Sequence, residues 1–196
     1  MNRQTSRFYD NFSFFYPLVD VFLRSQKRRL FDEVNKLPAG KVLEIGVGNG
    51  AQLKHYTRHK VTAIDSSIKM LDIARKRKKS NVDLLPMDGE DLLFENNSFD
   101  YIVMSHVIAV VEEPEKMLRE SYRVLKPGGR IIILNHFTPE NWLRYIDRSF
   151  SILSKKFHFR SHFRMEDLKT LSSFELLKRV DLGAFSYFKL LIYQKK

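Results

Sequence analysis

A glycine-rich turn directly follows a short apolar run at residues 42–50, which read Val-Leu-Glu-Ile-Gly-Val-Gly-Asn-Gly. Val42, Leu43 and Ile45 suit a parallel strand that is buried on both faces. The glycines that follow are typical of a backbone that turns tightly and approaches a ligand closely. Glu44 is a carboxylate inside the apolar run, and such a group is costly to bury without a partner. The segment therefore predicts a parallel α/β sheet with a cationic ligand at the end of its first strand.

Two kinds of nucleotide ligand are compatible with this turn. Gly46, Gly48 and Ala51 fit the spacing of the dinucleotide-binding fingerprint, in which alanine can replace the last glycine. A pyrophosphate would place negative charge beside Glu44, whereas the sulfonium and amino groups of S-adenosylmethionine are positive. The carboxylate therefore favours S-adenosylmethionine.

Length and composition exclude several classes of protein. A chain of 196 residues forms one domain and leaves little room for a separate substrate-binding domain. It has no cysteine, which excludes disulfides, thiolate metal sites and cysteine nucleophiles. The six histidines show no paired ligand spacing, so no metal site is expected. Neither a secretory signal nor the roughly 20 apolar residues of a membrane span are apparent. We expect a cytoplasmic protein.

Positive charge is high and clustered. The formal net charge is +11, with basic clusters at 24–29, 75–79 and 155–164. Such a field attracts anionic surfaces, either nucleic acid or acidic lipid headgroups. For each cluster the alternative is an ordinary solvated surface.

Strands alternate with helices along the chain, which predicts a doubly wound parallel sheet. The expected strands are 41–46, 61–65, 81–86, 99–104 and 130–134, the last preceded by a sharp turn at Lys126-Pro-Gly-Gly129. The expected helices lie within 3–36, at about 50–58, from Ser66 or Ser67 to Arg77, and at 114–124.

The carboxyl-terminal part departs from this alternation. Phe174–Asp181 and Phe185–Tyr193 are β-rich and are separated by three residues, so we expect an antiparallel hairpin. A single domain should thus comprise four parts. These are a helical arm (1–36), a cofactor-binding core (37–137), a helical insertion (138–172) and the hairpin (173–196).

Polar residues follow the ends of the predicted strands, where ligands bind in open α/β sheets. Asp65 lies 19 positions after the first glycine of the turn, which suits an acid that receives ribose hydroxyls, although an aspartate there could also cap the next helix. Asp88 could accept from an adenine amino group while Met87 packs on the ring; the alternative is an ordinary loop acid. Ser105 and His106 end the fourth strand, above the glycine turn.

Several segments together resemble the class I S-adenosylmethionine-dependent methyltransferases. They are LEIGVGNG, the acid in AID, MDGEDLLF before NNSFDYIV, and LKPGGRIII, and they run from Val42 to Leu134. The resemblance implies a Rossmann-like seven-stranded sheet whose last strand is antiparallel. It also implies Glu44 near the methionine amino group, Asp65 on the ribose and Asp88 on the adenine. We expect the cofactor, and its product S-adenosylhomocysteine, to contact Tyr16, Glu44, Gly46, Val47, Gly48, Asn49, Asp65, Ser66, Met87, Asp88, Gly89 and Ser105.

Features that the sequence lacks argue against some classes of methyl acceptor. Methylation of cytosine at C5 requires a cysteine, and this chain has none. Enzymes of this fold that methylate amino groups of nucleic acids carry an Asn- or Asp-Pro-Pro-aromatic motif after the fourth strand, where this chain reads Ser105-His106-Val107-Ile108. Both observations disfavour nucleic acid as the substrate.

Aromatic and basic residues instead favour a substrate at an anionic membrane surface. They are combined at residues 7–29 and interleaved at 155–164. The chain most resembles bacterial phosphatidylethanolamine N-methyltransferases, through Tyr9-Asp10, EIGVGNG and Asn135-His136-Phe137. We therefore expect a peripheral enzyme of the inner membrane face that methylates a lipid or small-molecule amine. Its catalytic residues would be Tyr9, His106, Asn135 and His136, and its substrate phosphate would bind Arg160, His162 and Arg164.

The sequence is also compatible with other roles for the arm, for the histidines and for the protein as a whole. The arm could be a helix that covers the core and closes over the cofactor, and both histidines could be hydrogen-bonded wall residues. The acceptor could be a quinone precursor or another apolar small molecule. A non-catalytic cofactor-binding protein or a basic RNA-binding module is the remaining alternative.

Overall fold

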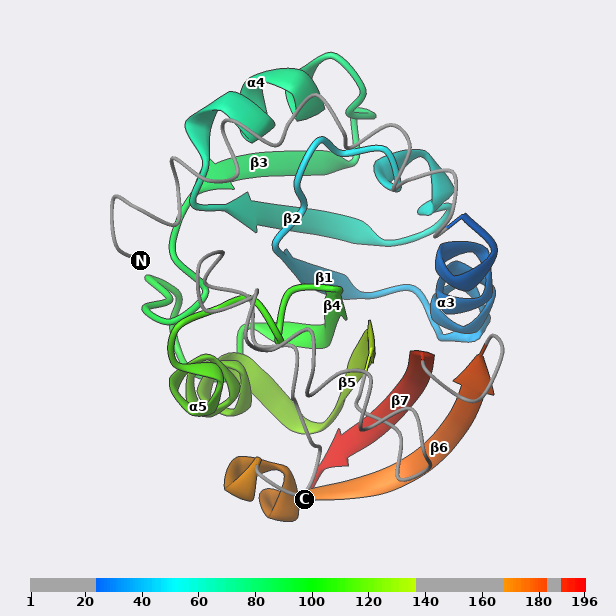
Figure 1. The fold of residues 1–196 in the computed structure, drawn as a ribbon, viewed down its shortest axis with the longest axis vertical. Helices are drawn as coiled ribbons and strands as arrows, with labels where there is room; N and C mark the ends of the chain where they lie inside the picture. Colours follow the sequence, from blue (N-terminus) through cyan, green and yellow to red (C-terminus); the bar gives the residue numbers. More distant parts are fainter. Residues whose placement is uncertain (1–23, 137–167, 183–187) are drawn as a thin grey trace, which may run out of the picture.

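A mostly parallel sheet forms the centre of the molecule (Figure 1). The computed structural model describes residues 24–136, 168–182 and 188–196. Within them, seven strands lie in the order β3-β2-β1-β4-β5-β7-β6. Neighbours from β3 to β5 are parallel, whereas β7 is antiparallel to both β5 and β6. The strands are β1 (Lys41–Ile45), β2 (Lys60–Asp65), β3 (Val82–Pro86), β4 (Phe99–Ser105), β5 (Leu125–His136), β6 (Phe174–Leu182) and β7 (Phe188–Lys195). The predicted doubly wound sheet with a carboxyl-terminal hairpin is confirmed.

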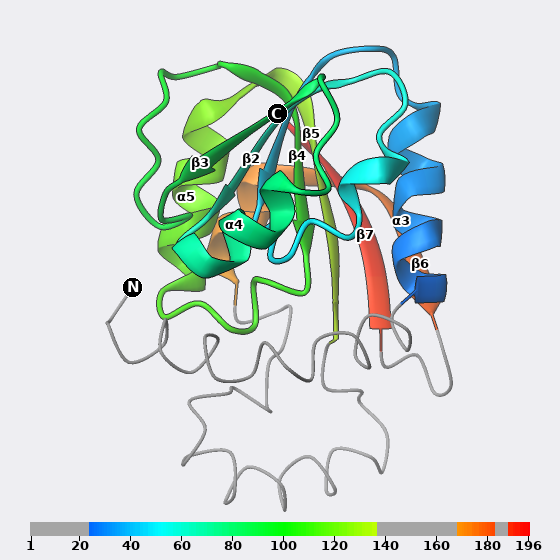
Figure 2. The same cartoon turned by 90° about the horizontal axis from the view of Figure 1, so that it is seen from above.

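Helices cover both faces of this sheet. Successive side chains of a strand point to opposite faces, so Leu43 packs in one apolar layer and its neighbour Val42 in the other. The first layer includes Met117 and Leu118 of α5 (Pro114–Val124), and the second includes residues of α3 (Arg24–Lys36) and α4 (Ile68–Arg75). Figure 2 shows α5 and α3 on opposite sides of the sheet. None of the described helices is long and apolar enough to cross a membrane.

The prediction of a helix near residues 50–58 is wrong. Only a 3-10 turn, η2 (Leu53–His55), forms there. Gly50 has a φ of +71°, which lies outside the right-handed helical region. Tyr56 is extended, with φ −72° and ψ 123°, and its buried ring packs edge-on against Phe31 of α3 at a centroid distance of 4.9 Å. Burial of this ring therefore ends the helical turn early.

The sharp turn predicted at 126–129 lies inside β5 rather than before it. The first residue of β5 pairs with Phe99 of β4, and pairing resumes between Tyr101 and Arg130. A segment of β5 therefore bulges out opposite a single residue of β4. Gly128, with a φ of +73°, provides the reversal that this bulge needs.

The other predicted elements in the described residues start and end close to their expected positions. The predicted insertion lies mainly outside the described residues; its last part contributes η4 (Lys169–Ser173), a 3-10 helix that contacts α5. There the backbone N–H of Thr170 donates to Glu115 Oε2 at 3.1 Å. Residues 1–23 of the predicted arm also lie outside the described part of the chain.

An ion-pair cluster joins α3 to the edge strand β6. Glu33 is 7% exposed, and its two carboxylate oxygens accept from the ammonium groups of Lys36 and Lys178, each at 2.8 Å. Burial raises the pKa of Glu33, but the hydrogen bonds and charges of Lys178 and Lys36 more than offset this, so the pKa lies below its ordinary value. Folding therefore favours the charged carboxylate.

We expect the substitution Glu33→Gln to destabilise the protein at neutral pH by about 1 kcal/mol or less, because both lysines are well exposed to water. A carboxyl with a lowered folded pKa contributes stability above its unfolded pKa and loses it as the pH falls through the folded pKa. The difference in unfolding free energy, measured by urea denaturation, should therefore shrink on acidification. Glu175→Gln at an exposed position of β6 is the control. A difference in unfolding free energy that does not change with pH would contradict the conclusion that folding favours the charged form of Glu33.

Candidate active site

The carboxyl ends of the central strands share one edge of the sheet. Ile45 at the end of β1 pairs with Ile64 of β2 and with Met104 of β4. Asp65 and Ser105 come directly after these partners. The polar residues predicted at the strand ends are therefore brought together, as required for a ligand site in an open α/β sheet.

Glu44 is fully buried in the middle of the sheet. Its Oε1 accepts a hydrogen bond from the Gln52 side-chain amide at 2.8 Å. Its Oε2 has no hydrogen-bond partner among the described residues. Burial raises the pKa of this carboxyl to about 7, against the lowering influence of Gln52, the Tyr56 hydroxyl and Lys27. A cation that reaches Oε2 would offset the penalty of burying the charge.

Two of the three glycines in the glycine turn have different neighbours. Gly46 and Gly48 both have left-handed backbones, with φ of +74° and +55°. A side-chain carbon at Gly46 would lie 2.6 Å from Cγ2 of Val107, so the packing of the protein itself requires glycine there. Among the described residues, no atom lies within 4 Å of the corresponding position at Gly48. Open space beside bare backbone is what a closely bound ligand needs.

Asp65 connects this turn to the start of α4. Its Oδ2 accepts from the backbone N–H of Gly48 at 2.8 Å, and its Oδ1 accepts from that of Ser67 at 2.9 Å. Burial raises the pKa of Asp65 more than these two bonds lower it. Ser67, rather than Ser66, caps α4, since its hydroxyl accepts from the N–H of Met70 at 3.3 Å. Asp65 thus fixes the local backbone, and its predicted contact with the ribose stays a prediction.

Val47 and Asn49 contribute mainly to the shape of the turn. The Val47 side chain is buried in the layer under α3, and its backbone carbonyl accepts from the N–H of Gly50 at 3.1 Å and from Gln52 at 3.0 Å. The Asn49 side-chain oxygen accepts from the N–H of Ala51 at 3.0 Å, and its carbonyl accepts from the Arg77 guanidinium at 3.3 Å. Their predicted cofactor contacts stay predictions.

The segment after β3 is held close to the turn. The N–H of Met87 donates to the Asp65 carbonyl at 3.2 Å, and Asp88 Oδ1 accepts from the N–H of Glu90 at 3.0 Å. A side-chain carbon at Gly89 would lie 2.6 Å from Cγ2 of Ile45, so this segment passes directly against β1. Met87 and Asp88 therefore lie near the ends of β1 and β2, and their predicted contacts with the adenine stay predictions.

Glu90 is a site-supporting residue that the sequence did not reveal. It is 5% exposed, and its Oε1 accepts from the backbone N–H groups of Glu112 and Glu113, at 2.9 and 3.0 Å. It thereby fastens the Asp88 segment to the loop that leads into α5. The partners lie 22 and 23 positions away, so no local pattern indicates the contact.

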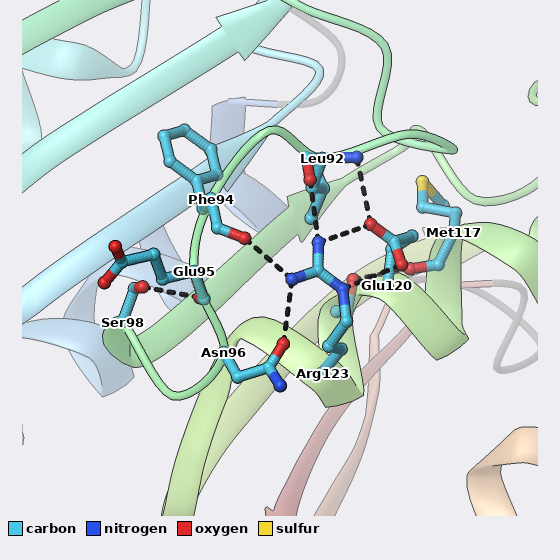
Figure 3. Close-up of polar contacts among 9 residues, drawn as sticks. Leu92, Phe94, Glu95, Asn96, Ser98, Met117, Glu120 and Arg123 are labelled. Atoms are coloured by element: carbon cyan, nitrogen blue, oxygen red, sulfur yellow. Dashed lines mark hydrogen bonds and ion pairs between the residues drawn. The ribbon is translucent and has the colours of Figure 1, made fainter.

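Arg123 of α5 holds the segment that follows Glu90 in the sequence (Figure 3). Its guanidinium donates to the carbonyls of Leu92 and Phe94, both at 2.7 Å, and forms an ion pair with Glu120 at 2.7 Å. Glu120 Oε2 also accepts from the N–H of Leu92 at 3.0 Å. The spacing of Glu120 and Arg123 on a helix could have indicated their pair, but not the carbonyl contacts.

The residues predicted to contact the methyl acceptor or the cofactor at the ends of β4 and β5 have defined environments. His106 has a φ of +59°, its N–H donates to the Leu134 carbonyl at 2.7 Å, and its ring packs edge-on against Phe188 of β7 at 5.6 Å. Asn135 is fully buried. The Ser105 hydroxyl is buried without a hydrogen-bond partner among the described residues.

Several predicted residues lie outside the part of the chain that the structure describes: Tyr9, Tyr16, Arg160, His162 and Arg164. The backbone of His136 belongs to β5, opposite Phe188.

The described residues fit S-adenosylmethionine in two respects. The unpaired oxygen of Glu44 suits the ammonium group of the methionine moiety, and the open space beside Gly48 suits the close approach of the cofactor to the backbone. A pyrophosphate would fit poorly beside a buried carboxylate.

Comparison with known proteins agrees with this geometry. The model of the family described as "Methyltransferase domain" matches residues 43–133. Phosphatidylethanolamine N-methyltransferase of Cereibacter sphaeroides is 31% identical over 179 residues, which cover 88% of each chain. Demethylmenaquinone methyltransferase of Renibacterium salmoninarum is 34% identical over 61% of this chain, and the match spans 53% of that relative.

Among solved structures, a SAM-dependent methyltransferase of Thermotoga maritima superposes with a TM-score of 0.74. It is 26% identical, and the match covers 97% of this chain and 99% of that one. Fold, site and relatives lead to one conclusion: this chain belongs to the class I S-adenosylmethionine-dependent methyltransferases and is an enzyme that uses S-adenosylmethionine as its methyl donor.

Proposed function

We propose that this enzyme methylates the amine of an aminophospholipid headgroup, such as that of phosphatidylethanolamine, at an anionic membrane surface. The match to the Cereibacter sphaeroides enzyme carries the proposal, because it spans 88% of both chains. An alignment of 179 residues extends well beyond the predicted cofactor-binding core at 37–137. It therefore includes much of the chain that surrounds the acceptor in this proposal.

The strand-end acids are assigned to the cofactor. Glu44 binds the ammonium of the methionine moiety, Asp65 accepts from the ribose hydroxyls and Asp88 accepts from the adenine amino group. Each carboxylate oxygen can accept more than one hydrogen bond, so Asp65 can hold the backbone and the ribose at the same time.

The acceptor amine reacts by in-line displacement. Bound S-adenosylmethionine supplies an electrophilic methyl group; the amine lone pair forms the new C–N bond as the C–S bond breaks. The protein must hold the nitrogen on this axis within about 3–3.5 Å and exclude water. We assign the orienting role to the predicted catalytic residues Tyr9, His106, Asn135 and His136. The proton that leaves the amine passes to a histidine, a tyrosine or water.

The headgroup phosphate is assigned to Arg160, His162 and Arg164. Charge-assisted hydrogen bonds from guanidinium groups are strong and directional toward phosphate. The net charge of +11 supports this assignment, because it draws the enzyme toward anionic lipid.

The acceptor can be tested with full-length protein and radiolabelled S-adenosylmethionine. We expect label to enter phosphatidylethanolamine in mixed vesicles with phosphatidylglycerol. The double variant Arg160→Gln/Arg164→Gln should raise KM for the lipid by about tenfold or more, through the lost phosphate contacts. Its affinity for S-adenosylhomocysteine should not change. Lys116→Gln/Arg119→Gln on the exposed face of α5 is the charge-matched control.

Quinone methylation is the second candidate, because a demethylmenaquinone methyltransferase is 34% identical over part of the chain. Transfer to demethylmenaquinone but not to phosphatidylethanolamine would contradict the phospholipid proposal. A methylation rate that does not change in the Arg160→Gln/Arg164→Gln variant would also contradict the phospholipid proposal.

The cofactor assignment predicts that Asp65→Asn weakens binding of S-adenosylhomocysteine by about 10- to 100-fold in calorimetric titration. The amide would present N–H where a carboxylate oxygen now accepts from Gly48 or Ser67, and it would lose an acceptor for the ribose. Asp72→Asn on exposed α4 makes the same change of charge and should bind normally. Unchanged affinity of Asp65→Asn would refute the ribose assignment.

A further inference from the structure

Gln52 has a place in the site that neither its sequence context nor the family match assigns. It lies just before η2 and is 5% exposed. Its side-chain nitrogen donates to Glu44 Oε1 at 2.8 Å and to the backbone carbonyl of Val47 at 3.0 Å. A primary amide has two N–H donors, so both are used. One buried side chain thus joins the acid of β1 to the glycine turn.

We infer that Gln52 is a positioning residue for cofactor binding, which holds Glu44 against the glycine turn and leaves Oε2 of that carboxylate to accept from the ammonium group of the donor. The inference concerns the cofactor end of the site, so it does not depend on which acceptor the enzyme methylates.

The groups around Glu44 indicate that Gln52 affects the ionisation of this carboxyl as well as its position. Besides Gln52, the charged and titratable groups that act on Glu44 are Lys27 of α3, Asp65 at the end of β2 and the buried Tyr56 hydroxyl. Lys27 lowers the pKa of Glu44 through its charge, and Asp65 raises it. Gln52 donates directly to Glu44 Oε1, and the nearby Tyr56 hydroxyl also lowers the pKa of Glu44. Donation to a carboxylate favours its charged form.

The charge of Glu44 should therefore control cofactor affinity. Burial raises the pKa of this carboxyl to about 7, so part of the population is protonated at neutral pH. A neutral carboxyl attracts an ammonium group poorly. Affinity for the cofactor should rise as the pH increases through this pKa and level off once Glu44 is ionised. Without the Gln52 donor, the rise should occur at higher pH.

The test is calorimetric titration of full-length protein with S-adenosylhomocysteine, across roughly pH 5.5 to 8.5. Gln52→Met keeps the size of the side chain and removes the donor. We expect affinity near neutral pH to fall about tenfold and the midpoint of the pH profile to move up by about one unit. Gln52→Asn, whose amide is one methylene shorter, should move the midpoint in the same direction and serves if Gln52→Met does not fold.

Two comparisons separate this role from simple support of the loop. Asn35→Leu removes an amide that donates to the His55 carbonyl at 2.8 Å in the same loop but does not contact Glu44. It should lower the melting temperature without moving the midpoint. In a Glu44→Gln background, Gln52→Met should no longer change the pH profile. An unchanged midpoint in Gln52→Met, or an equal shift in Asn35→Leu, would overturn the inference.

Discussion

A carboxylate buried in an apolar sheet is the constraint on which the site depends. Glu44 is shielded from water on β1, and the Gln52 amide satisfies one of its oxygens. The other oxygen has no partner among the described residues, so the charged form is costly until a cation arrives. The position is therefore poor for stability and good for binding a positive ligand. That imbalance is expected where function, rather than packing, determines the residue.

Other acids at the same edge bind the protein's own backbone. Asp65 accepts from Gly48 and Ser67, and Glu90 accepts from the loop before α5. Each carboxylate joins two segments that follow different strands. The ligand-facing loops are consequently ordered by the protein itself, which lowers the conformational entropy that binding must remove. The acids thus preorganise the loops at this edge of the sheet.

The sequence predicted what depends on local pattern. Strand periodicity and the residues at strand ends gave the sheet and placed Glu44, Asp65 and Asp88 at one edge. Gln52, Glu90 and Arg123 were missed because their roles lie in contacts with particular atoms of other segments, some of them more than 20 positions away. The helix near 50–58 failed for the same reason, since the contact of Tyr56 with Phe31 overrides local helical propensity.

The surface charge and the buried carboxylate of Glu44 act at different distances on the methyl donor and on an anionic surface. Part of the basic cluster at 75–79 is used internally, since Lys79 donates to the Lys54 carbonyl at 2.7 Å and Arg77 to the Asn49 carbonyl. The overall field of a chain with net charge +11 still repels a cationic donor and attracts an anionic surface. Salt screens such a field beyond about 8–10 Å, whereas a buried carboxylate acts at contact with little screening. Under the proposed function, affinity for the donor therefore comes from Glu44 and its neighbours, and the surface charge brings the enzyme to the phosphate-bearing acceptor.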